Sequence, residues 1–287
     1  MSQRFGERVR TALRTRGPLC VGIDPHAALL AAWGLTDDAQ GVREFGLRTV
    51  EAASGAVGVV KPQVSFFERF GSQGIAALED VLAAARAAGL IVIADAKRGD
   101  IGSTMDDYAR AWLTPGTPLE ADALTVNPFL GVGALDGAFA LAEQHGKGLF
   151  VLAATSNPEA EGLQRSTGAT GSTVSASIIS EVSARNEASA RNAASSTAGE
   201  WGSFGFVIGA TVDWAAAGIA PFAPAAPILA PGFGAQGAEP ADLRPRFGEM
   251  ADAVIASESR SILSAGPADL AEAISTRSAE YLEVAGV

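Results

Sequence analysis

The sequence has only one cysteine and two histidines among its 287 residues. A single cysteine rules out an internal disulfide, and the place of Cys20 in the apolar run 19–23 predicts a buried hydrophobic side chain rather than a nucleophile. With only His26 and His145, a histidine-rich metal site is excluded and most histidine-dependent nucleophile triads lose their base. The chemistry must therefore come from Asp, Glu, Lys or Arg, and the scarcity of cysteine fits a protein of the reducing cytoplasm.

Positive charge is also scarce, because 21 Lys and Arg face 32 Asp and Glu for a net charge of −11. Without a broad basic surface to neutralise phosphates, we expect no nucleic-acid partner and no binding to an anionic membrane. Long hydrophobic runs are missing too, since a run such as 149–154 falls far short of the roughly 18 residues that span a bilayer. An anionic ligand must therefore be held by a few well-placed cations.

The first 17 residues are rich in arginine. Such a segment could be a transit peptide, but Glu7 interrupts the basic stretch. Three apolar residues, Phe5, Val9 and Leu13, recur at the spacing of one helix face. We therefore predict an amphipathic helix over residues 1–17 rather than a targeting signal.

Eight short apolar runs alternate with alanine-rich segments of helical period along a chain that is 48% apolar and 18% charged. The runs lie at 19–23, 57–60, 90–94, 121–126, 149–153, 204–208, 227–230 and 253–256. Each is apolar throughout, as expected of a strand buried on both faces of a parallel sheet. Eight strand-then-helix units without a Pro/Gly linker predict an α/β fold, a single (β/α)₈ TIM barrel over residues 1–287 with the N-terminal helix beneath it. A doubly wound sheet is the alternative.

The segment 171–199 is rich in serine and alanine, and it carries a Ser-Ala-Arg-Asn repeat at 183–186 and 189–192. Such a composition marks a segment of low complexity. We predict a long surface helix with a loose end and no function.

Polar residues follow several of the predicted strands, at the positions that face the common mouth of a barrel. Asp24 ends the first strand, Lys61 the second, and Asp95 and Lys97 the third. Buried charges are costly unless they are paired, so alternating Asp and Lys at adjacent strand ends predict a pre-arranged ion network. Further polar or turn-forming residues at strand ends are Thr155, Ser156, Pro231, Gly232, Ser259 and Arg260.

The third strand end carries the pattern Asp95-x-Lys97-x-x-Asp100. Residues two apart on a strand project from the same face, which would bring the first two charges together. So short a pattern could also be ordinary solvated charges in a loop. Its position directly after a buried strand, with Lys61 and Asp24 at the two preceding strand ends, favours a functional site.

The seventh strand runs into Gly-Phe-Gly-Ala-Gln-Gly at 232–237, which formally satisfies the Gly-x-Gly-x-x-Gly pattern of dinucleotide-binding proteins. That fingerprint normally follows a first strand, whereas this one lies late in the chain. Barrels commonly bind phosphate through the loops after strands seven and eight. Gln236, Gly237 and Arg260 therefore predict a phosphate site, with an ordinary flexible turn as the alternative.

Four segments together resemble the orotidine 5′-phosphate decarboxylase family. They are Val-Gly-Ile-Asp-Pro at 21–25, Val-Lys-Pro-Gln at 60–63, Asp-Ala-Lys-Arg-Gly-Asp-Ile at 95–101 and Pro-Gly-Phe-Gly-Ala-Gln-Gly at 231–237. A fifth, Asn-Pro-Phe-Leu-Gly at 127–131, is similar to the longer bacterial, mycobacterial-like branch of that family. The resemblance spans nearly the whole chain.

The resemblance implies a reaction and its catalytic residues. The family converts orotidine 5′-phosphate to uridine 5′-phosphate, the last step of de novo pyrimidine biosynthesis, and uses no metal and no cofactor. The resemblance implies that Lys97 stabilises and protonates the carbanion at C6 of the pyrimidine, while Asp95 lies against the departing carboxylate. Lys61 and Asp100 would complete an alternating array of charges that aims Lys97.

The resemblance also assigns substrate contacts, which fall on Asp24, Ile101, Thr104, Thr155, Ser156, Pro231, Gln236, Gly237 and Arg260. Asp24 and Thr104 would serve the ribose and the phosphate side, and Thr155 and Ser156 would read the base. Taken alone, those two residues could instead be a helix N-cap before Asn157. Ser259 departs from the family pattern, because some relatives have glycine there, which leaves the local backbone contact to phosphate open.

An assembly is implied as well. In the family, the segment that follows the third strand crosses a two-fold interface. Asp100, Ile101 and Thr104 would then complete the site of the neighbouring subunit, and the active unit would be a homodimer with shared active sites.

Three alternatives share parts of this pattern. A sugar-phosphate decarboxylase or aldolase of the same barrel group would use Mg²⁺ and an acidic residue where this chain has Lys61, and a lysine repels the metal. A Schiff-base aldolase would need an isolated lysine of depressed pKa, which flanking aspartates oppose. A barrel that only binds nucleotide phosphate would not need Lys97 and its aspartates.

Overall fold

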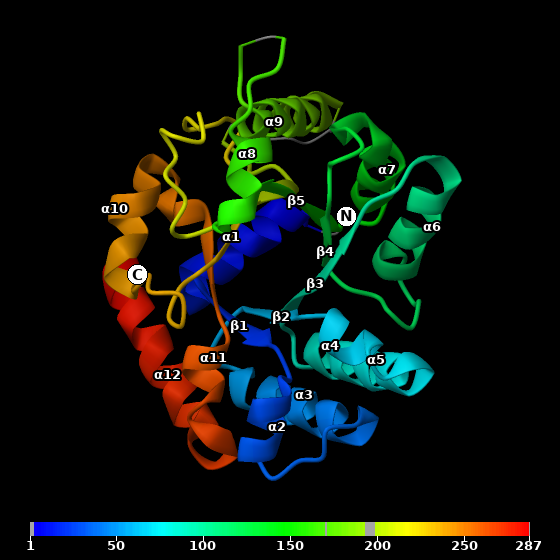
Figure 1. The fold of residues 1–287 in the computed structure, drawn as a ribbon, viewed down its shortest axis with the longest axis vertical. Coiled ribbons are helices and arrows are strands. Elements are labelled where there is room, and N and C mark those ends of the chain that lie inside the picture. Colours follow the sequence, from blue (N-terminus) through cyan, green and yellow to red (C-terminus); the bar gives the residue numbers. More distant parts are fainter. Residues whose placement is uncertain (1–2, 170, 193–198, 287) are drawn as a thin grey trace.

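Eight parallel strands close into a barrel in the computed structural model, which describes residues 3–169, 171–192 and 199–286 (Figure 1). The strands are β1 (Leu19–Ile23), β2 (Val59–Pro62), β3 (Ile91–Arg98), β4 (Ala123–Val126), β5 (Gly148–Ala154), β6 (Phe204–Ile208), β7 (Ile228–Pro231) and β8 (Val254–Glu258). Each pairs with the next in chain order, and β8 pairs with β1. The predicted (β/α)₈ barrel is confirmed, with all eight strands at the expected runs.

Helices surround the barrel on its outer face. The longer ones are α3 (Ala39–Ala53), α5 (Gly71–Ala87), α6 (Gly102–Leu113), α7 (Asp136–Gln144), α9 (Val174–Asn192) and α12 (Gly266–Ala285). Short helices follow the strands or precede the longer helices: α2 (Ala27–Ala32), α4 (Ser65–Glu68), α8 (Glu161–Gln164), α10 (Leu243–Phe247) and α11 (Arg260–Leu263). Within the described residues, no helix is long and apolar enough to cross a membrane.

One of the eight expected strand-then-helix units departs from the pattern. The described segment 209–227, between β6 and β7, contains turns and no helix. Three prolines, Pro221, Pro224 and Pro227, fall within this segment. Because proline lacks the backbone N–H and clashes with the preceding turn, they prevent a helix here despite the alanine content.

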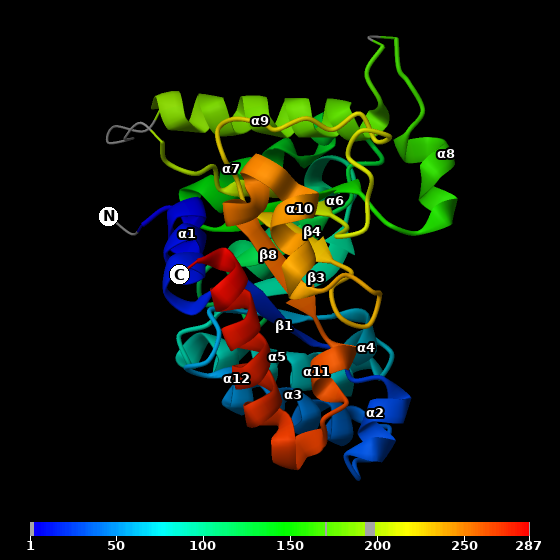
Figure 2. The same ribbon diagram turned by 90° about the vertical axis from the view of Figure 1, so that its left-hand side faces the viewer.

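The predicted N-terminal helix is confirmed as α1 (Phe5–Arg16). It lies at the same end of the molecule as both chain termini (Figure 2). The three residues expected on one face are buried against the strand side chains that point into the barrel; they are Phe5, Val9 and Leu13. Arg8 adds an ion pair to Asp122 at 2.6 Å. The helix therefore closes the bottom of the barrel.

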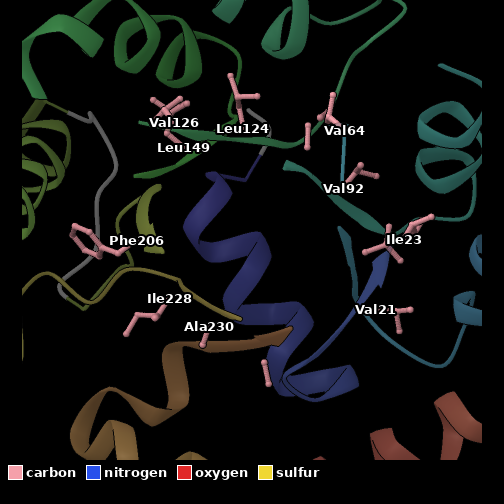
Figure 3. Close-up of a cluster of buried hydrophobic side chains, with 14 of the residues drawn as sticks. Val21, Ile23, Val64, Val92, Leu124, Val126, Leu149, Phe206, Ile228 and Ala230 are labelled. Atoms are coloured by element: carbon pink, nitrogen blue, oxygen red, sulfur yellow. The ribbon is translucent and has the colours of Figure 1, made fainter. Parts of the chain in front are cut away.

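Two hydrophobic cores follow from the alternation of side chains along each strand. On β1, Val21 belongs to the core between the barrel and its helices, whereas Cys20 belongs to the core inside the barrel. Figure 3 shows outward-pointing members of the first core, among them Leu124 and Phe206, around the ring of strands that encloses α1. Cys20 is buried as predicted, and burial raises the pKa of its thiol to about 12.

Helix α9 covers most of the serine- and alanine-rich segment, as predicted. It is more than a surface helix, because the buried side chain of Asn186 donates to the carbonyl of Phe204 at 2.7 Å and accepts its N–H at 3.1 Å. These bonds fix α9 to β6. The predicted loose end at 193–198 lies outside the described residues.

Phe5→Ala should lower the free energy of unfolding by about 3 to 5 kcal/mol, because Phe5 is fully buried and its ring packs edge-on against Phe150 at 6.0 Å. Gly148 shows how closely the ring is packed, since a Cβ atom there would overlap Phe5. Urea unfolding measures the change. Thr15→Ala, on the exposed face of the same helix, is the control. Equally small changes in the free energy of unfolding for both variants would contradict a stabilising role for the packing of α1 against the barrel.

Candidate active site

A cavity of about 540 Å³ opens at the carboxyl ends of the strands. Figure 2 shows α2, α4 and α11 at this end of the barrel and α1 at the other. Seven of the residues predicted from the sequence line it together: Asp24, Lys61, Asp95, Lys97, Pro231, Gln236 and Arg260. They come from β1, β2, β3 and β7, from the loop after β7 and from the start of α11. The barrel thus brings together in space residues that are up to 236 positions apart in the chain (24 to 260).

The predicted ion network runs along one wall of this cavity. Asp95 is at its centre, with Lys61 Nζ 2.9 Å from one carboxylate oxygen and Lys97 Nζ 2.6 Å from the other. Asp24 Oδ1 lies 3.8 Å from the same Lys61 nitrogen. Asp95 and Lys61 are buried, whereas the Lys97 side chain is 45% exposed and reaches into the cavity.

The electrostatics of the buried pair follow from these distances. Burial alone would raise the pKa of Asp95, but Lys61 and Lys97 hold that pKa well below its usual range. Burial alone would lower the pKa of Lys61, but Asp95 and Asp24 outweigh it and hold the pKa above its usual value. Both groups are therefore charged across the physiological pH range.

The backbone around Lys97 is irregular. Lys97 has a φ of 49°, in the left-handed region that disfavours side chains other than glycine. Its strand bulges here, because Ala94 pairs with Leu124 and Arg98 pairs with Val126. Bulges commonly re-aim side chains next to active sites. Here the bulge lies directly at the Asp95-x-Lys97 motif.

Two buried side-chain atoms of cavity-lining residues have no hydrogen-bond partner among the described residues, although one of them lies 3.8 Å from Lys61 Nζ. They are Asp24 Oδ1 and the hydroxyl oxygen of Ser259. Buried polar atoms are normally paired, so an unpaired one in a cavity wall indicates a group that a ligand satisfies. Ser259, the residue that departs from glycine, thus adds a hydroxyl to the site.

The loop after β7 is held in a compact shape by its own backbone. Gly234 N–H donates to the carbonyl of Ala238 at 2.7 Å, and Gly237 N–H donates to that of Gly234 at 2.8 Å. Gly234 has a φ of 67°, and a Cβ atom there would overlap Ser261 and Glu258. Glycine is thus required at this position, both for its conformation and for the close approach of β8.

An ion cluster beside this loop connects it to the barrel. Arg277 on α12 binds Glu258 of β8 at 2.7 Å and Glu239, at the end of the loop, at 2.8 Å. Glu258 is fully buried and also accepts the hydroxyls of Tyr281 at 2.6 Å and Ser261 at 2.7 Å. The end of the loop is therefore tied through Arg277 to β8 and α12.

Six predicted site residues lie outside the cavity: Asp100, Ile101, Thr104, Thr155, Ser156 and Gly237. The first three lie on the turn and helix that leave β3, and Ile101 is 62% exposed. Their predicted roles stay predictions.

Thr155 binds Asn157 at 2.7 Å and Gln164 at 2.9 Å beside a neighbouring hollow. The alternative of an N-cap at 155 or 156 is wrong, because Asn157 itself precedes the short helix 158–160.

The structure also adds residues that the sequence did not single out as site residues. His26, Gln63, Ser65, Phe66, Phe233 and Ser257 line the same cavity. Gln63 donates to the backbone carbonyl of Asp95 at 3.2 Å and lies 3.5 Å from Lys61 Nζ. Its place two residues after Lys61 was a usable signal, because such residues share a face of a strand. No comparable signal marked the pair of His26 and Phe66, whose rings meet edge-on at 4.3 Å.

Comparisons with known proteins agree with this geometry. A family model, Orotidine 5′-phosphate decarboxylase / HUMPS family, matches residues 17–275. A relative from Corynebacterium efficiens, named orotidine 5′-phosphate decarboxylase, is 49% identical over 285 residues and covers 98% of both chains. One of the same name from Salinispora arenicola is 51% identical over 263 residues, covering 92% of this chain and 91% of the relative.

Solved structures give the same picture. A structure from Streptomyces avermitilis superposes with a TM-score of 0.91 at 47% identity, covering 100% of this chain and 98% of the other. The OMP decarboxylase of Leishmania donovani superposes with a TM-score of 0.78 at 27% identity, covering 99% and 100%.

Lys61→Met should destabilise the fold by about 3 to 5 kcal/mol at about pH 7, because Asp95 would remain buried without one of its cations. Loss of that cation raises the pKa of Asp95, so the folded variant binds a proton at a higher pH than the folded wild type does. The stability difference between the two proteins should therefore shrink as the pH falls through the raised pKa.

Urea unfolding at about pH 7 and about pH 4 measures both differences. Arg43→Met is the matched control, because it removes an ion pair of 2.6 Å in which both side chains are exposed, and it should cost at most about 1 kcal/mol at either pH. A cost for Lys61→Met that is the same at both pH values contradicts the assignment of the pH effect to Asp95.

Proposed function

This chain belongs to the Orotidine 5′-phosphate decarboxylase / HUMPS family, and we propose that it converts orotidine 5′-phosphate to uridine 5′-phosphate and CO₂, the last step of de novo pyrimidine biosynthesis. The observation that carries the proposal is the charged wall of Asp24, Lys61, Asp95 and Lys97 in one cavity at the barrel mouth. Its residues suffice for the chemistry without a cofactor or a metal.

The chemical difficulty is a carbanion at C6 of the pyrimidine, which the ring cannot delocalise. Lys97 supplies a cation beside that carbon and then the proton that replaces CO₂. Because the negative charge at C6 develops only in the transition state, a fixed cation there lowers the barrier more than it strengthens substrate binding. The 2.6 Å contact with Asp95 holds the Lys97 ammonium group in place before substrate arrives.

Asp95 has a second role toward the substrate carboxylate. Its two oxygens are already engaged by Lys61 and Lys97, so its charge is fixed and buried at the wall where the carboxylate lies. Like charge at this point disfavours the bound carboxylate and favours departure of CO₂. Lys61 offsets the cost of burying the Asp95 charge, which would otherwise need to be solvated by water.

Binding energy away from the pyrimidine comes from the loops after β7 and β8. Gln236 and Arg260 line the cavity and take the phosphate together with the neighbouring Gly237, and the hydroxyl of Ser259, which has no hydrogen-bond partner among the described residues, adds a donor beside Arg260. In a chain of net charge −11, Arg260 is a placed cation of the kind an anionic ligand needs. The unpaired Asp24 oxygen accepts a ribose hydroxyl. Pro231 borders the pyrimidine, and Thr155 and Ser156 read its edge.

The active unit is a cytoplasmic homodimer, each subunit a single domain over residues 1–287. The rim of the mouth supports a second copy, because Ile101, Phe129 and Leu130 are all more than half exposed. The loops that carry them are adjacent, since Asn127 N–H donates to the carbonyl of Arg98 at 2.8 Å. An exposed apolar patch of this kind is typical of an interface. Asp100, Ile101 and Thr104 then complete the partner's site.

The same-barrel alternatives are not favoured by the site. A Mg²⁺-dependent sugar-phosphate enzyme would place the ion where Lys61 Nζ lies between Asp24 and Asp95. A barrel that binds nucleotide without catalysis would have no use for an ammonium group held at 2.6 Å from a buried carboxylate.

Wild-type protein treated with a chelator should consume orotidine 5′-phosphate, seen as loss of its absorbance, and release uridine 5′-phosphate. Lys97→Ala should abolish turnover but keep affinity for uridine 5′-phosphate within about one or two orders of magnitude, because Lys97 acts chiefly on the transition state. Arg14→Ala, an exposed cation at the other end of the barrel, is the control. Inactive wild-type protein would refute the function, and equal loss of binding and turnover would refute the role of Lys97.

Mixing two inactive variants tests the shared site. Asp100→Ala and Lys97→Ala dimers are dissociated and reassembled together, which makes about half of the dimers mixed. Each mixed dimer has one site with both native residues and one site with neither, so about a quarter of all sites should regain activity. Activity that stays at the sum of the parents despite proven subunit exchange would mean that Asp100 serves its own chain.

A further inference from the structure

A buried threonine of β4 faces the bulge that carries the catalytic motif. Leu124 and Val126 of β4 pair with Ala94 and Arg98 of β3, so residues 95–97 of β3 stand opposite Thr125 alone. Thr125 is fully buried and takes no part in the cavity lining. Its neighbours Leu124 and Val126 belong to the outer core, so Thr125 points into the barrel and lies beneath the charged wall.

The hydroxyl of Thr125 bonds to both ends of the Asp95-x-Lys97 motif. It accepts the backbone N–H of Lys97 at 2.9 Å and lies 3.0 Å from Asp95 Oδ1, to which it donates its proton. A threonine hydroxyl has one proton to donate and can accept at the same time, so both bonds are made together. The Ala94 carbonyl, 3.5 Å away, is a poorer acceptor for that proton.

Each of these bonds acts on a feature that the reaction needs. The bond to Oδ1 fixes the rotation of the Asp95 carboxylate, so that Oδ1 faces Lys97 and Oδ2 faces Lys61. The bond from the Lys97 N–H satisfies a part-buried donor in a left-handed conformation that lysine adopts only under constraint. The same oxygen thus sets the carboxylate and the backbone from which the Lys97 side chain projects.

We propose that Thr125 is a positioning residue for decarboxylation, which aligns the Asp95–Lys97 pair through its single hydroxyl group. This inference rests on the function proposed above. Packing alone does not explain the residue, because valine has nearly the same shape and would suit the apolar surroundings of Ala123 and Phe150 inside the barrel. A buried hydroxyl is costly unless it is bonded, and its partners here are those two residues of the motif.

Thr125→Val removes the hydroxyl and keeps the volume, and Thr125→Ser keeps the hydroxyl. We expect Thr125→Val to lower kcat by about tenfold to a hundredfold, as for loss of a hydrogen bond to a charged group, and Thr125→Ser to restore most of it. Affinity for uridine 5′-phosphate should change by less than about threefold, because Thr125 does not touch the cavity.

Thr49→Val is the matched control. Thr49 is equally buried, but its hydroxyl donates to the carbonyl of Phe45 at 2.8 Å on the outer helix α3. It should cost some stability and leave kcat per folded molecule unchanged. A Thr125→Val enzyme with wild-type kcat per binding site, or a Thr125→Ser enzyme as slow as Thr125→Val, would overturn the proposal.

A crystal structure of Thr125→Val separates failure of this proposal from failure of the proposed function. If wild-type protein does not decarboxylate orotidine 5′-phosphate, the proposed function is wrong whatever Thr125 does. The structure still tests positioning, because we expect the Asp95 carboxylate to rotate and the φ of Lys97 to leave the left-handed region. An unchanged carboxylate and an unchanged φ would overturn the role of the hydroxyl.

Discussion

The buried carboxylate of Asp95 is the charge on which the rest of the site depends. It is only 7% exposed, and it is stable there because a lysine lies on each of its oxygens. A neutral residue in place of either lysine would leave the buried carboxylate with only one of its two cations. The arrangement therefore commits three strands, β1 through Asp24, β2 through Lys61 and β3, to a fixed geometry at the mouth. Substrate meets charges that are already oriented, so little of its binding energy is needed to arrange them.

Stability and chemistry occupy opposite ends of the same barrel. At the bottom, α1 closes the interior with apolar side chains and an ion pair from Arg8 to Asp122. At the mouth, the inner layer of β3 changes from apolar to charged between Ile93 and Asp95, two successive residues of its inward face. Such a division is typical of this fold, and it permits strain at Lys97 because the well-packed lower barrel holds β3 in place.

The sequence was sufficient to predict the barrel, the N-terminal helix and the set of charges at the mouth, because each depends on local pattern and on strand order. It placed the end of β3 at Ala94, whereas the strand continues to Arg98, since polar site residues still form ladder hydrogen bonds that hydrophobicity does not reveal. The helix expected between β6 and β7 is absent from the described segment 209–227, because prolines prevent it although the alanine content favours a helix. Thr125 was beyond prediction for another reason. Its role depends on the register of β4 against a bulge in β3, and the hydrophobic pattern of the two strands does not show where that bulge lies.

The two functional parts of the mouth are supported in different ways, and the difference follows from what each must do. The charges that we propose to face the developing carbanion are held by short-range bonds within the strands, because a displaced ammonium group loses most of its effect on the transition state. The loop after β7 is held at its ends instead, by β7 at its start and by the ion pair of Arg277 and Glu239 at its end, while Ala235, Gln236 and Gly237 stay exposed between them. A loop with fixed ends and an exposed middle can close on a phosphate without disturbing β8. The binding energy gained at the phosphate can therefore help to hold the pyrimidine close to the charged wall, whose side chains are fixed by their own bonds.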